Sequence, residues 1–341
     1  MMSELLFLFL NLLFSPLGIS GWIPMTKNAR IHLPTRKLQY HSNPDRRRLS
    51  MIQEQQQLPI YPLRLCILIP AYNEADRIGT TLETYHDMLL QLRLEKQWRT
   101  EILVVDDGSQ DATSEIVNSF PGKIPISCIS MKKNCGKGSA LSRGIQHIHS
   151  RIGDSASVDS KSEDEAFLIL TQDADGSGDL KFLFARNAMM TSLQKMLQKQ
   201  NVTDSHGKPA FDRSKPALVT GNREYDLFSA RGITRWGFKT VVRLIVGDLG
   251  VQDTQCGYKL MTLSAATMLY KDLHLTGWAH DVEVLYRCKL NRIPVSEVPI
   301  DWKDKKGSKV EAEGVFQVSI RMLLDVLRLR WEYSVTGAWK T

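Results

Sequence analysis

The stretch Glu101-Ile-Leu-Val-Val-Asp-Asp-Gly-Ser109 decides the fold, because it has the pattern of a fully buried strand that ends in acids and a turn. A similar apolar run precedes it at 65–69, and another follows at 166–170. Between the first two runs, apolar residues recur every three or four positions over 74–95, which predicts a helix. This alternation predicts an α/β fold with a single doubly wound, mostly parallel sheet flanked by helices.

The composition is that of an ordinary folded protein. The chain has 341 residues, of which 43% are hydrophobic and 24% charged, which excludes a disordered polymer, a fibre and a multi-span membrane bundle. Its five cysteines are scattered and form no Cys-x-x-Cys pair. We therefore expect no disulfide framework or zinc module, and a reducing compartment fits this cysteine usage.

The N-terminus carries the strongest charge pattern. An apolar run from Leu5 to Met25 is long enough to cross a bilayer, and seven basic residues with one acid follow it between Lys27 and Arg48. Basic residues after the run favour a membrane anchor with a cytosolic domain, although a cleaved or interfacial segment is the alternative. The formal net charge of +7 suits an anionic partner. No nucleic-acid-binding module is present, so we expect no nucleic acid partner.

These patterns divide the chain into four parts. They are a transmembrane or interfacial anchor at 1–25, a basic polar linker at 26–60, the main α/β domain at 61–311 and a basic amphipathic helix at 312–341. The last part either lies on an anionic membrane surface or packs on the domain with a solvated basic face.

Acidic side chains follow three of the predicted strands. Glu74 follows the first strand, Asp106 and Asp107 the second, and Asp173 and Asp175 the last. Ligands bind outside the carboxyl ends of strands in open parallel sheets, and clustered carboxylates need a cation or donors among them. On an extended segment Asp173 and Asp175 would face the same way, which suits a hard divalent cation. Gly136-Lys137-Gly138 is too short for a dinucleotide or P-loop motif, but it can bring a lysine to a diphosphate at a helix N-terminus.

Four motifs together resemble the inverting GT-A glycosyltransferases of family 2. They are Ile69-Pro-Ala-Tyr-Asn-Glu74, Val104-Val-Asp-Asp-Gly-Ser109, Asn134-Cys-Gly-Lys-Gly138 and Asp173-Ala-Asp175. Within that family the chain is most similar to the polyprenyl-phosphate sugar transferases, and among these to the dolichyl-phosphate β-glucosyltransferases. The segments Asp253-Thr-Gln-Cys-Gly-Tyr-Lys-Leu260 and Gly277-Trp-Ala-His-Asp281 support the similarity.

The resemblance implies a role for each matching residue. The nucleoside pocket would be lined by Pro70, Ala71, Tyr72 and Glu74, with Asp106 and Asp107 bonding uracil or ribose. Lys137 would approach the base or the diphosphate, while Asp173 and Asp175 would hold Mg²⁺ or Mn²⁺. Cations near the phosphates would be Arg223, Lys303 and Lys309.

Asp281 has two possible roles under this resemblance. Many inverting relatives use an aspartate in this region as the base that deprotonates an alcohol. A lipid phosphate is already ionised near neutral pH, so Asp281 would then orient lysine or arginine side chains instead. A carboxylate that only stabilises a helix N-terminus is the plain structural alternative.

The implied activity is inverting transfer of glucose from UDP-glucose to dolichyl phosphate. The product, dolichyl β-D-glucosyl phosphate, would serve N-glycan precursor assembly at the cytosolic face of the endoplasmic reticulum membrane. Two alternatives stay open. One is a dolichyl-phosphate mannosyltransferase that uses GDP-mannose, and the other is a non-catalytic subunit that binds a nucleotide sugar.

Overall fold

The computed structural model describes residues 63–155, 166–184, 189–203, 209–212, 214–223, 230–302 and 315–339. Contacts divide the chain into Met1–Arg47 and Arg48–Thr341, and every described residue belongs to the second unit. The predicted anchor and linker, together with Lys303 and Lys309, lie outside the described residues. Among the helices that are described, none is long and apolar enough to cross a membrane.

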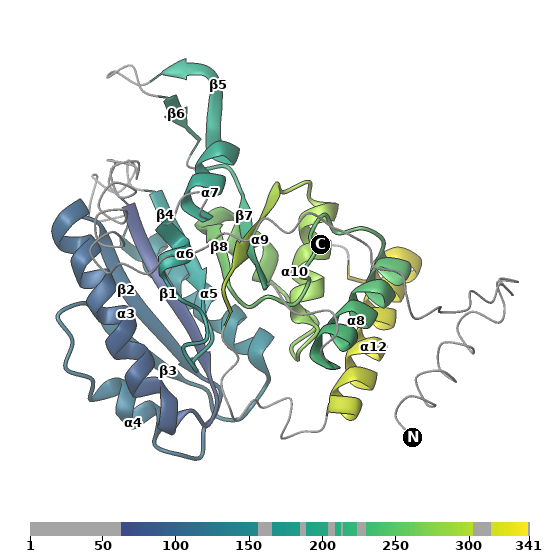
Figure 1. Cartoon of the computed structure of the whole chain (residues 1–341), viewed down its shortest axis with the longest axis horizontal. Helices are drawn as coiled ribbons and strands as arrows, with labels where there is room; N and C mark the ends of the chain where they lie inside the picture. The colour runs from purple at the N-terminus through teal and green to yellow at the C-terminus, as the bar shows by residue number, and fades with distance from the viewer. Residues whose placement is uncertain are drawn as a thin grey trace, which may run out of the picture. The chain divides into compact units, whose positions relative to one another are not determined.

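A seven-stranded sheet forms the centre of this unit, in the order β3-β2-β1-β4-β8-β7-β9 (Figure 1). The strands are β1 (Leu63–Ala71), β2 (Arg99–Asp106), β3 (Ile126–Ser130), β4 (Ala166–Thr171), β7 (Leu218–Arg223), β8 (Lys259–Thr262) and β9 (Val295–Ile300). The α/β prediction is confirmed: β1, β2 and β4 run parallel as expected, and β3 is parallel to β2. Strand β8 is antiparallel to both neighbours, while β7 and β9 are parallel.

The expectation of a single sheet is wrong in one respect. Strands β5 (Gln198–Thr203) and β6 (Pro209–Phe211) form a separate two-stranded antiparallel sheet. They lie within the polar stretch between Gln198 and Lys215 and project away from the main sheet (Figure 1). Such a polar hairpin offers little apolar surface to bury, so it does not join the central layer.

Helices cover both faces of the sheet because its strands are apolar on both sides. The helices are α3 (Ala75–Lys96), α4 (Thr113–Asn118), α5 (Lys137–Ser155), α6 (Lys181–Phe184), α7 (Met189–Leu197), α8 (Ala230–Val246), α9 (Leu263–Tyr270), α10 (His280–Leu290) and α12 (Val315–Trp331), the last followed by the π-helix Glu332–Thr336. In β1, Leu65, Ile67 and Ile69 join the core under α3. Cys66 and Leu68 join the opposite core under α5.

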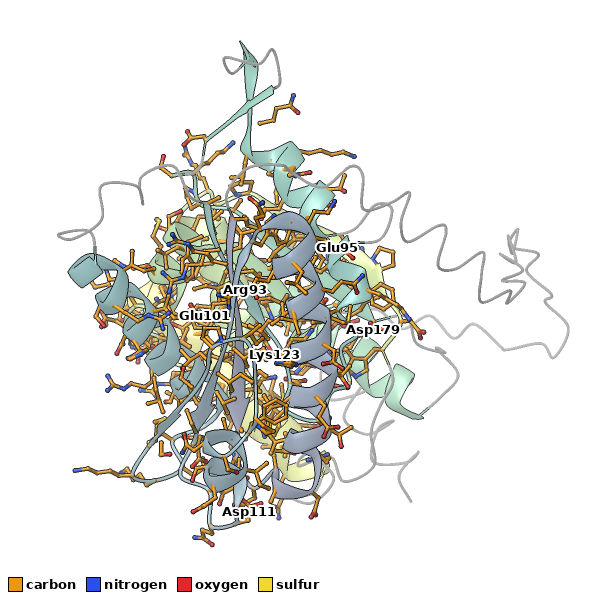
Figure 2. All side chains as sticks on the ribbon, turned by 90° about the vertical axis from the view of Figure 1, so that its left-hand side faces the viewer. Arg93, Glu95, Glu101, Asp111, Lys123 and Asp179 are labelled. Atoms are coloured by element: carbon orange, nitrogen blue, oxygen red, sulfur yellow. The ribbon has the colours of Figure 1, made fainter. Side chains whose placement is uncertain are left out.

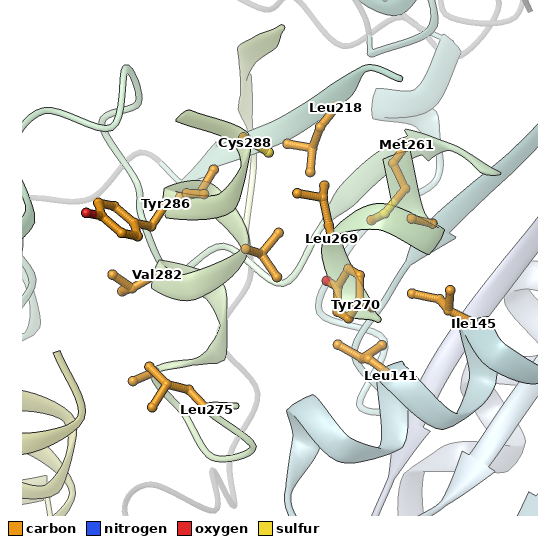
Figure 3. Packing of buried hydrophobic residues seen from close by; sticks show 14 of the residues in the cluster. Leu141, Ile145, Leu218, Met261, Leu269, Tyr270, Leu275, Val282, Tyr286 and Cys288 are labelled. Atoms are coloured by element: carbon orange, nitrogen blue, oxygen red, sulfur yellow. The ribbon is translucent and has the colours of Figure 1, made fainter. Parts of the chain in front are cut away.

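The core under α5 extends to the C-terminal part of the chain. Figure 3 shows side chains of α5 (Leu141, Ile145), α9 (Leu269, Tyr270) and α10 (Val282, Tyr286) packing in this cluster. Helix α12 adds a buried row of apolar side chains to the same core. The C-terminal helix is therefore part of the folded domain, and it shares a core with α10.

The two ends of the parallel strands differ in their side chains (Figure 2). Asp111 lies at the end where β2 stops, whereas Arg93 and Glu101 lie toward the end where it begins. A hollow of about 260 Å³ at the latter end is lined by Arg64, Arg93, Arg99, Thr100, Glu101 and Pro125. There Glu101 is paired with Arg64 and Arg151. The predicted site residues lie at the opposite end.

Candidate active site

The loops after β1 and β2 are joined by hydrogen bonds. The backbone N–H of Asn73 donates to Ser109 Oγ at 2.9 Å, and that of Glu74 donates to Thr113 Oγ1 at 2.8 Å. Asn73 adopts a positive φ of 51°, which turns the chain sharply out of β1 into α3. The predicted nucleoside-pocket residues of these two loops are therefore held in one fixed arrangement.

Asp107 holds the next loop in place. Its Oδ1 and Oδ2 accept the backbone N–H groups of Cys135 and Gly136, each at 2.8 Å. Burial raises the pKa of Asp107, and these two donors oppose that rise. Gly136 has a φ of 97°, and a Cβ there would lie 2.5 Å from the carbonyl oxygen of Thr276. Asp107 and Gly136 thus fix the loop from which Lys137 begins α5.

Lys137 reaches the acids that follow β4. Its Nζ donates to Asp173 Oδ1 at 2.5 Å. Burial opposes the charge of this lysine, yet Asp173 and Asp281 together raise the pKa of Lys137. A Cβ on Gly257 would lie 2.8 Å from Lys137 Nζ and 2.9 Å from Asp173 Oδ1, so only a glycine lets the backbone approach this pair.

The acidic segment is a turn, and the expectation of an extended segment is wrong. Strand β4 ends at Thr171, and Gly176 N–H donates to the Asp173 carbonyl oxygen at 3.4 Å. Ala174 between the two acids is buried, and its carbonyl accepts Thr81 Oγ1 at 2.9 Å. Ser177 donates to Asp175 Oδ1 through both its backbone N–H and its hydroxyl. The anchored turn, rather than alternation along a strand, determines how the two acids are presented.

Arg223 at the end of β7 is held by a bidentate ion pair. Its Nε and one terminal nitrogen donate to the two carboxylate oxygens of Asp253, at 2.6 and 2.9 Å. Its guanidinium also lies 5.5 Å from the centre of the Trp302 ring. Burial would raise the pKa of Asp253, but the hydrogen bonds and charge of Arg223 lower it. Arg223 is thereby fixed as a permanent cation beside the site.

A second ion pair lies deeper. Lys259 Nζ on β8 donates to Asp281 Oδ1 and to the carbonyl oxygen of Cys256. His280 Nε2 lies 3.3 Å from Asp281 Oδ1, and its Nδ1 lies 2.9 Å from the Gly277 carbonyl oxygen. Burial lowers the pKa of His280. Burial would raise the pKa of Asp281, but His280, Lys259 and Lys137 outweigh it and lower the value to about 2.

The structure brings together most of the residues selected from the sequence. Lys137 contacts Asp173 directly, and the charges of Asp281 and Arg223 both influence the pKa of Lys137. The pocket residues from β1 and β2 are joined through their loops, with Asp107 N–H donating to the Ala71 carbonyl at 2.8 Å. Three carboxylate–cation pairs therefore lie near the carboxyl ends of the parallel strands, namely Asp173 with Lys137, Asp253 with Arg223 and Asp281 with Lys259, and such an arrangement can bind a phosphorylated ligand.

Comparison with known proteins agrees with this chemistry. The model of glycosyl transferase family 2 matches residues 66–176. The dolichyl-phosphate beta-glucosyltransferase of Dictyostelium discoideum is 30% identical over 294 residues, covering 83% of this chain and 78% of that protein. The human enzyme of the same name is 30% identical over 288 residues, covering 81% and 78%. The chain belongs to the dolichyl-phosphate beta-glucosyltransferase family.

Solved structures also match this glycosyltransferase, at lower identity and with TM-scores below 0.5. Glucosyl-3-phosphoglycerate synthase from Mycobacterium tuberculosis, in complex with UDP, is 14% identical with a TM-score of 0.49, covering 82% of this chain and 83% of that one. The same synthase in complex with Mn²⁺, UDP-glucose and phosphoglyceric acid gives a TM-score of 0.45 at 15% identity, covering 81% and 82%.

The two acids of the turn fit a divalent cation in part. Asp173 Oδ1 is taken by Lys137 and Asp175 Oδ1 by Ser177, and the Oδ2 of each accepts no hydrogen bond from the described residues. Carboxylate oxygens are hard ligands that suit Mg²⁺ or Mn²⁺. Within the described residues no three acidic, histidine or cysteine side chains gather as a metal site. A cation here would take its remaining ligands from phosphate oxygens and water.

Sequence reasoning missed Lys259 and Asp253 as parts of this site in the transferase. One available signal was Lys259 within the apolar run Tyr258-Lys-Leu-Met261, because a buried lysine requires a counter-ion. Nothing in the sequence indicated that Asp281, 22 residues further along, would be that partner.

Proposed function

We propose that this family member transfers glucose from UDP-glucose to dolichyl phosphate with inversion at the anomeric carbon. The observation that carries the proposal is the hydrogen bond between Lys137 and Asp173, close enough to Arg223 for its charge to influence Lys137. It lies at the strand ends where the family-2 motifs converge. A nucleotide diphosphate and a lipid phosphate are both anionic. Lys137 and Arg223 are cations held in place at this site, and they could bind two such phosphate groups.

In the proposed reaction, an acceptor phosphate oxygen attacks the anomeric carbon from the side opposite UDP. The new carbon–oxygen bond forms as the bond to UDP breaks, and its electron pair stays on the diphosphate. The loops after β1 and β2 would bind uridine, with Tyr72 beside the base and Asp106 and Asp107 near uracil or ribose. A divalent cation held by Asp173 and Asp175 would neutralise the charge that grows on the leaving UDP. Lys137, at the start of α5, would stabilise the same negative charge on the leaving UDP.

The state of Asp281 supports a phosphate acceptor. A general base works best when its pKa lies near the working pH, whereas the pKa of Asp281 is lowered to about 2 and its Oδ1 is bound by Lys259. A phosphate monoester has its second pKa near 6 and is largely ionised at neutral pH. Such an acceptor needs no base, so Asp281 would position cations rather than remove a proton.

The acceptor also suggests where the enzyme works. We propose a single-pass protein of the endoplasmic reticulum membrane, anchored by Leu5–Met25, with its catalytic domain in the cytosol. The basic residues that follow this apolar run support that orientation. The product would supply glucose for N-glycan precursor assembly.

Parallel transfer assays test the donor and the acceptor. The full-length protein is reconstituted in vesicles with dolichyl phosphate and offered labelled UDP-glucose, UDP-N-acetylglucosamine or GDP-mannose in separate reactions. We expect label in the lipid phase from UDP-glucose alone, released by mild acid as glucose. Transfer from GDP-mannose instead would replace the glucosyl proposal, and no transfer from any donor, with UDP-glucose still bound, would favour a non-catalytic subunit.

A further inference from the structure

Helix α12 and the π-helical turn that follows it are apolar on two opposite faces. The inner row, Val318, Met322, Val326, Leu329 and Tyr333, is at most 7% exposed. The outer row, Ile320, Leu324, Leu327, Trp331 and Val335, is 44–62% exposed. With about 3.6 residues per turn, these two rows lie on opposite sides of the helix. A helix that only packs on a domain needs one apolar face, so the outer row requires another explanation.

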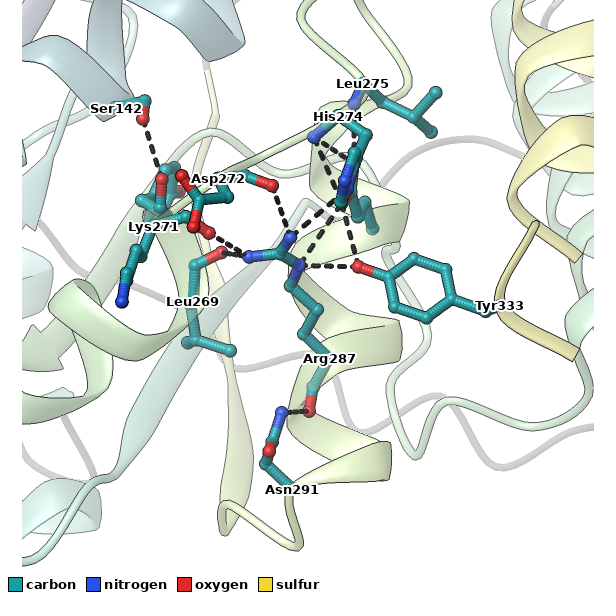
Figure 4. Close-up of polar contacts among 11 residues, drawn as sticks. Ser142, Leu269, Lys271, Asp272, His274, Leu275, Arg287, Asn291 and Tyr333 are labelled. Atoms are coloured by element: carbon teal, nitrogen blue, oxygen red, sulfur yellow. Dashed lines mark hydrogen bonds and ion pairs between the residues drawn. The ribbon is translucent and has the colours of Figure 1, made fainter. Parts of the chain in front are cut away.

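Contacts of the inner row hold the helix in this orientation. Tyr333 donates its hydroxyl to Glu283 Oε1 at 3.0 Å and accepts from Arg287 Nε at 2.7 Å (Figure 4). Nearer the start of the row, Gln255 Nε2 lies 3.7 Å from Met322 Sδ. Because Met322 and Tyr333 both contact the domain, the outer row cannot rotate inward. The Gln255 contact also places α12 next to the segment that carries Asp253, the partner of Arg223.

The helices that carry and flank the outer row are rich in basic residues. Helix α8 packs beside α12 (Figure 1). Together α8, α12 and the π-helical turn contain seven basic residues and two acids in the sequence. Helix α8 also exposes Leu244, whose side chain is 70% exposed next to the exposed Arg243. Two copies of such a surface would repel each other, whereas an anionic surface would attract it.

We propose that the outer row docks into the interfacial layer of an anionic lipid bilayer. Leucine and isoleucine side chains would enter the boundary between headgroups and acyl chains, with Trp331 at headgroup depth. The exposed Arg243 of α8 and the exposed Arg321, Arg328 and Arg330 of α12 would contact the lipid phosphates. Docking of the outer row on lipid does not depend on the proposed function. The idea that docking brings a lipid-linked acceptor to the site does rest on the proposed function.

Quenching of Trp331 by brominated lipid tests the docking. The full-length protein is reconstituted in phosphatidylserine-containing vesicles with and without bromine on the acyl chains. The chain has seven tryptophans, and Trp22 lies in the predicted anchor, so the Trp331→Phe variant is measured in parallel and subtracted. We expect a clear Trp331 component of quenching, which weakens in pure phosphatidylcholine and at high salt.

A charge variant with a matched control sharpens the test. Replacing Leu324 and Leu327 together by Glu removes apolar surface and adds repulsion from anionic lipid, so the Trp331 component should fall at least about twofold. Leu94→Glu is the control, because Leu94 on α3 is 74% exposed and lies outside the proposed surface. All these side chains are exposed, so the melting temperatures should match that of the parent protein.

Three outcomes overturn the proposal. One is no Trp331 quenching by brominated lipid, and another is an equal loss of quenching in the Leu94→Glu control. The third is protection of Trp331 from aqueous acrylamide without lipid. Protection that vanishes on dilution would assign the outer row to a second copy, and protection that persists would assign it to another segment of this chain. Quenching needs no donor, so absence of glucosyl transfer with quenching intact would count against the proposed function alone.

Discussion

Lys259 on β8 and Asp281 in the first turn of α10 form an ion pair that is almost completely buried, with exposed fractions of 1% and 4%. The same ammonium group donates to the carbonyl oxygen of Cys256, the residue before Gly257. Since Gly257 lies against Lys137 and Asp173, the ion pair supports the backbone directly behind them. Asp281 thus contributes to the site by holding a cation and a loop in place.

Removing the lysine should be far more damaging than removing the pair. Lys259→Met leaves the Asp281 carboxylate buried without its cation, and we expect a loss of about 3–5 kcal/mol in the free energy of unfolding. The double variant Lys259→Met/Asp281→Leu should recover most of that loss, because no buried charge is left. Urea unfolding of both variants, with the partly exposed Lys137→Met as a milder comparison, measures the difference. Equal stability of the single and double variants would contradict the pairing.

The lowered pKa of Asp281 predicts a loss of stability in acid. The value is about 2 in the folded protein against an ordinary 3.8, so the ionised carboxylate stabilises the fold above about pH 4. That contribution disappears as the pH falls through the folded pKa, and it amounts to about 2 kcal/mol. Unfolding free energies measured between pH 5 and pH 2 should decline less steeply in Asp281→Asn than in the parent protein. Parallel curves would show that another group causes the acid sensitivity.

Strands β1, β2 and β4 could be predicted because each is a run of apolar side chains closed by proline, acids or a polar turn. Strand β1 was expected at 65–69 and spans Leu63–Ala71, and β4 was expected at 166–170 and spans Ala166–Thr171. The positions of the strand-end acids followed from the parallel topology. Beyond that point polar residues interrupt β7 and β9, and β8 has only four residues, so no comparable apolar run predicted these strands.

The site contacts themselves could not be predicted from local patterns. Asp107 accepts the backbone N–H groups of a loop 28 and 29 residues away, and such a pairing depends on the three-dimensional course of the chain. The turn at Asp173 likewise follows from the hydrogen bond between Thr81 and the Ala174 carbonyl, a contact across 93 residues. Sequence periodicity reports on burial within one element, whereas these contacts join separate elements.

The acids of the turn predict dependence on a divalent cation. Asp175→Asn keeps the size of the side chain and one oxygen but loses the negative charge that a hard cation needs. We expect most of the glucosyl transfer to be lost, with a melting temperature close to that of the parent protein. Excess EDTA should abolish transfer in the parent, and Mg²⁺ or Mn²⁺ should restore it. Full activity in EDTA, or in the variant, would contradict the metal assignment.

Arg223 and Asp281 together predict which kind of acceptor the enzyme uses. Arg223 can hold a phosphate through parallel donors, and lysine offers only a point charge, so Arg223→Lys should raise the KM for dolichyl phosphate more than that for UDP-glucose. The variant keeps a cation beside Asp253, which limits its effect on folding. Loss of a general base typically lowers kcat by about 100- to 10,000-fold, and Asp281→Asn should cost less than that because a phosphate needs no deprotonation. Both KM values and kcat are measured with each substrate varied. A collapse of kcat in Asp281→Asn, with an unchanged acceptor KM in Arg223→Lys, would instead indicate a hydroxyl acceptor.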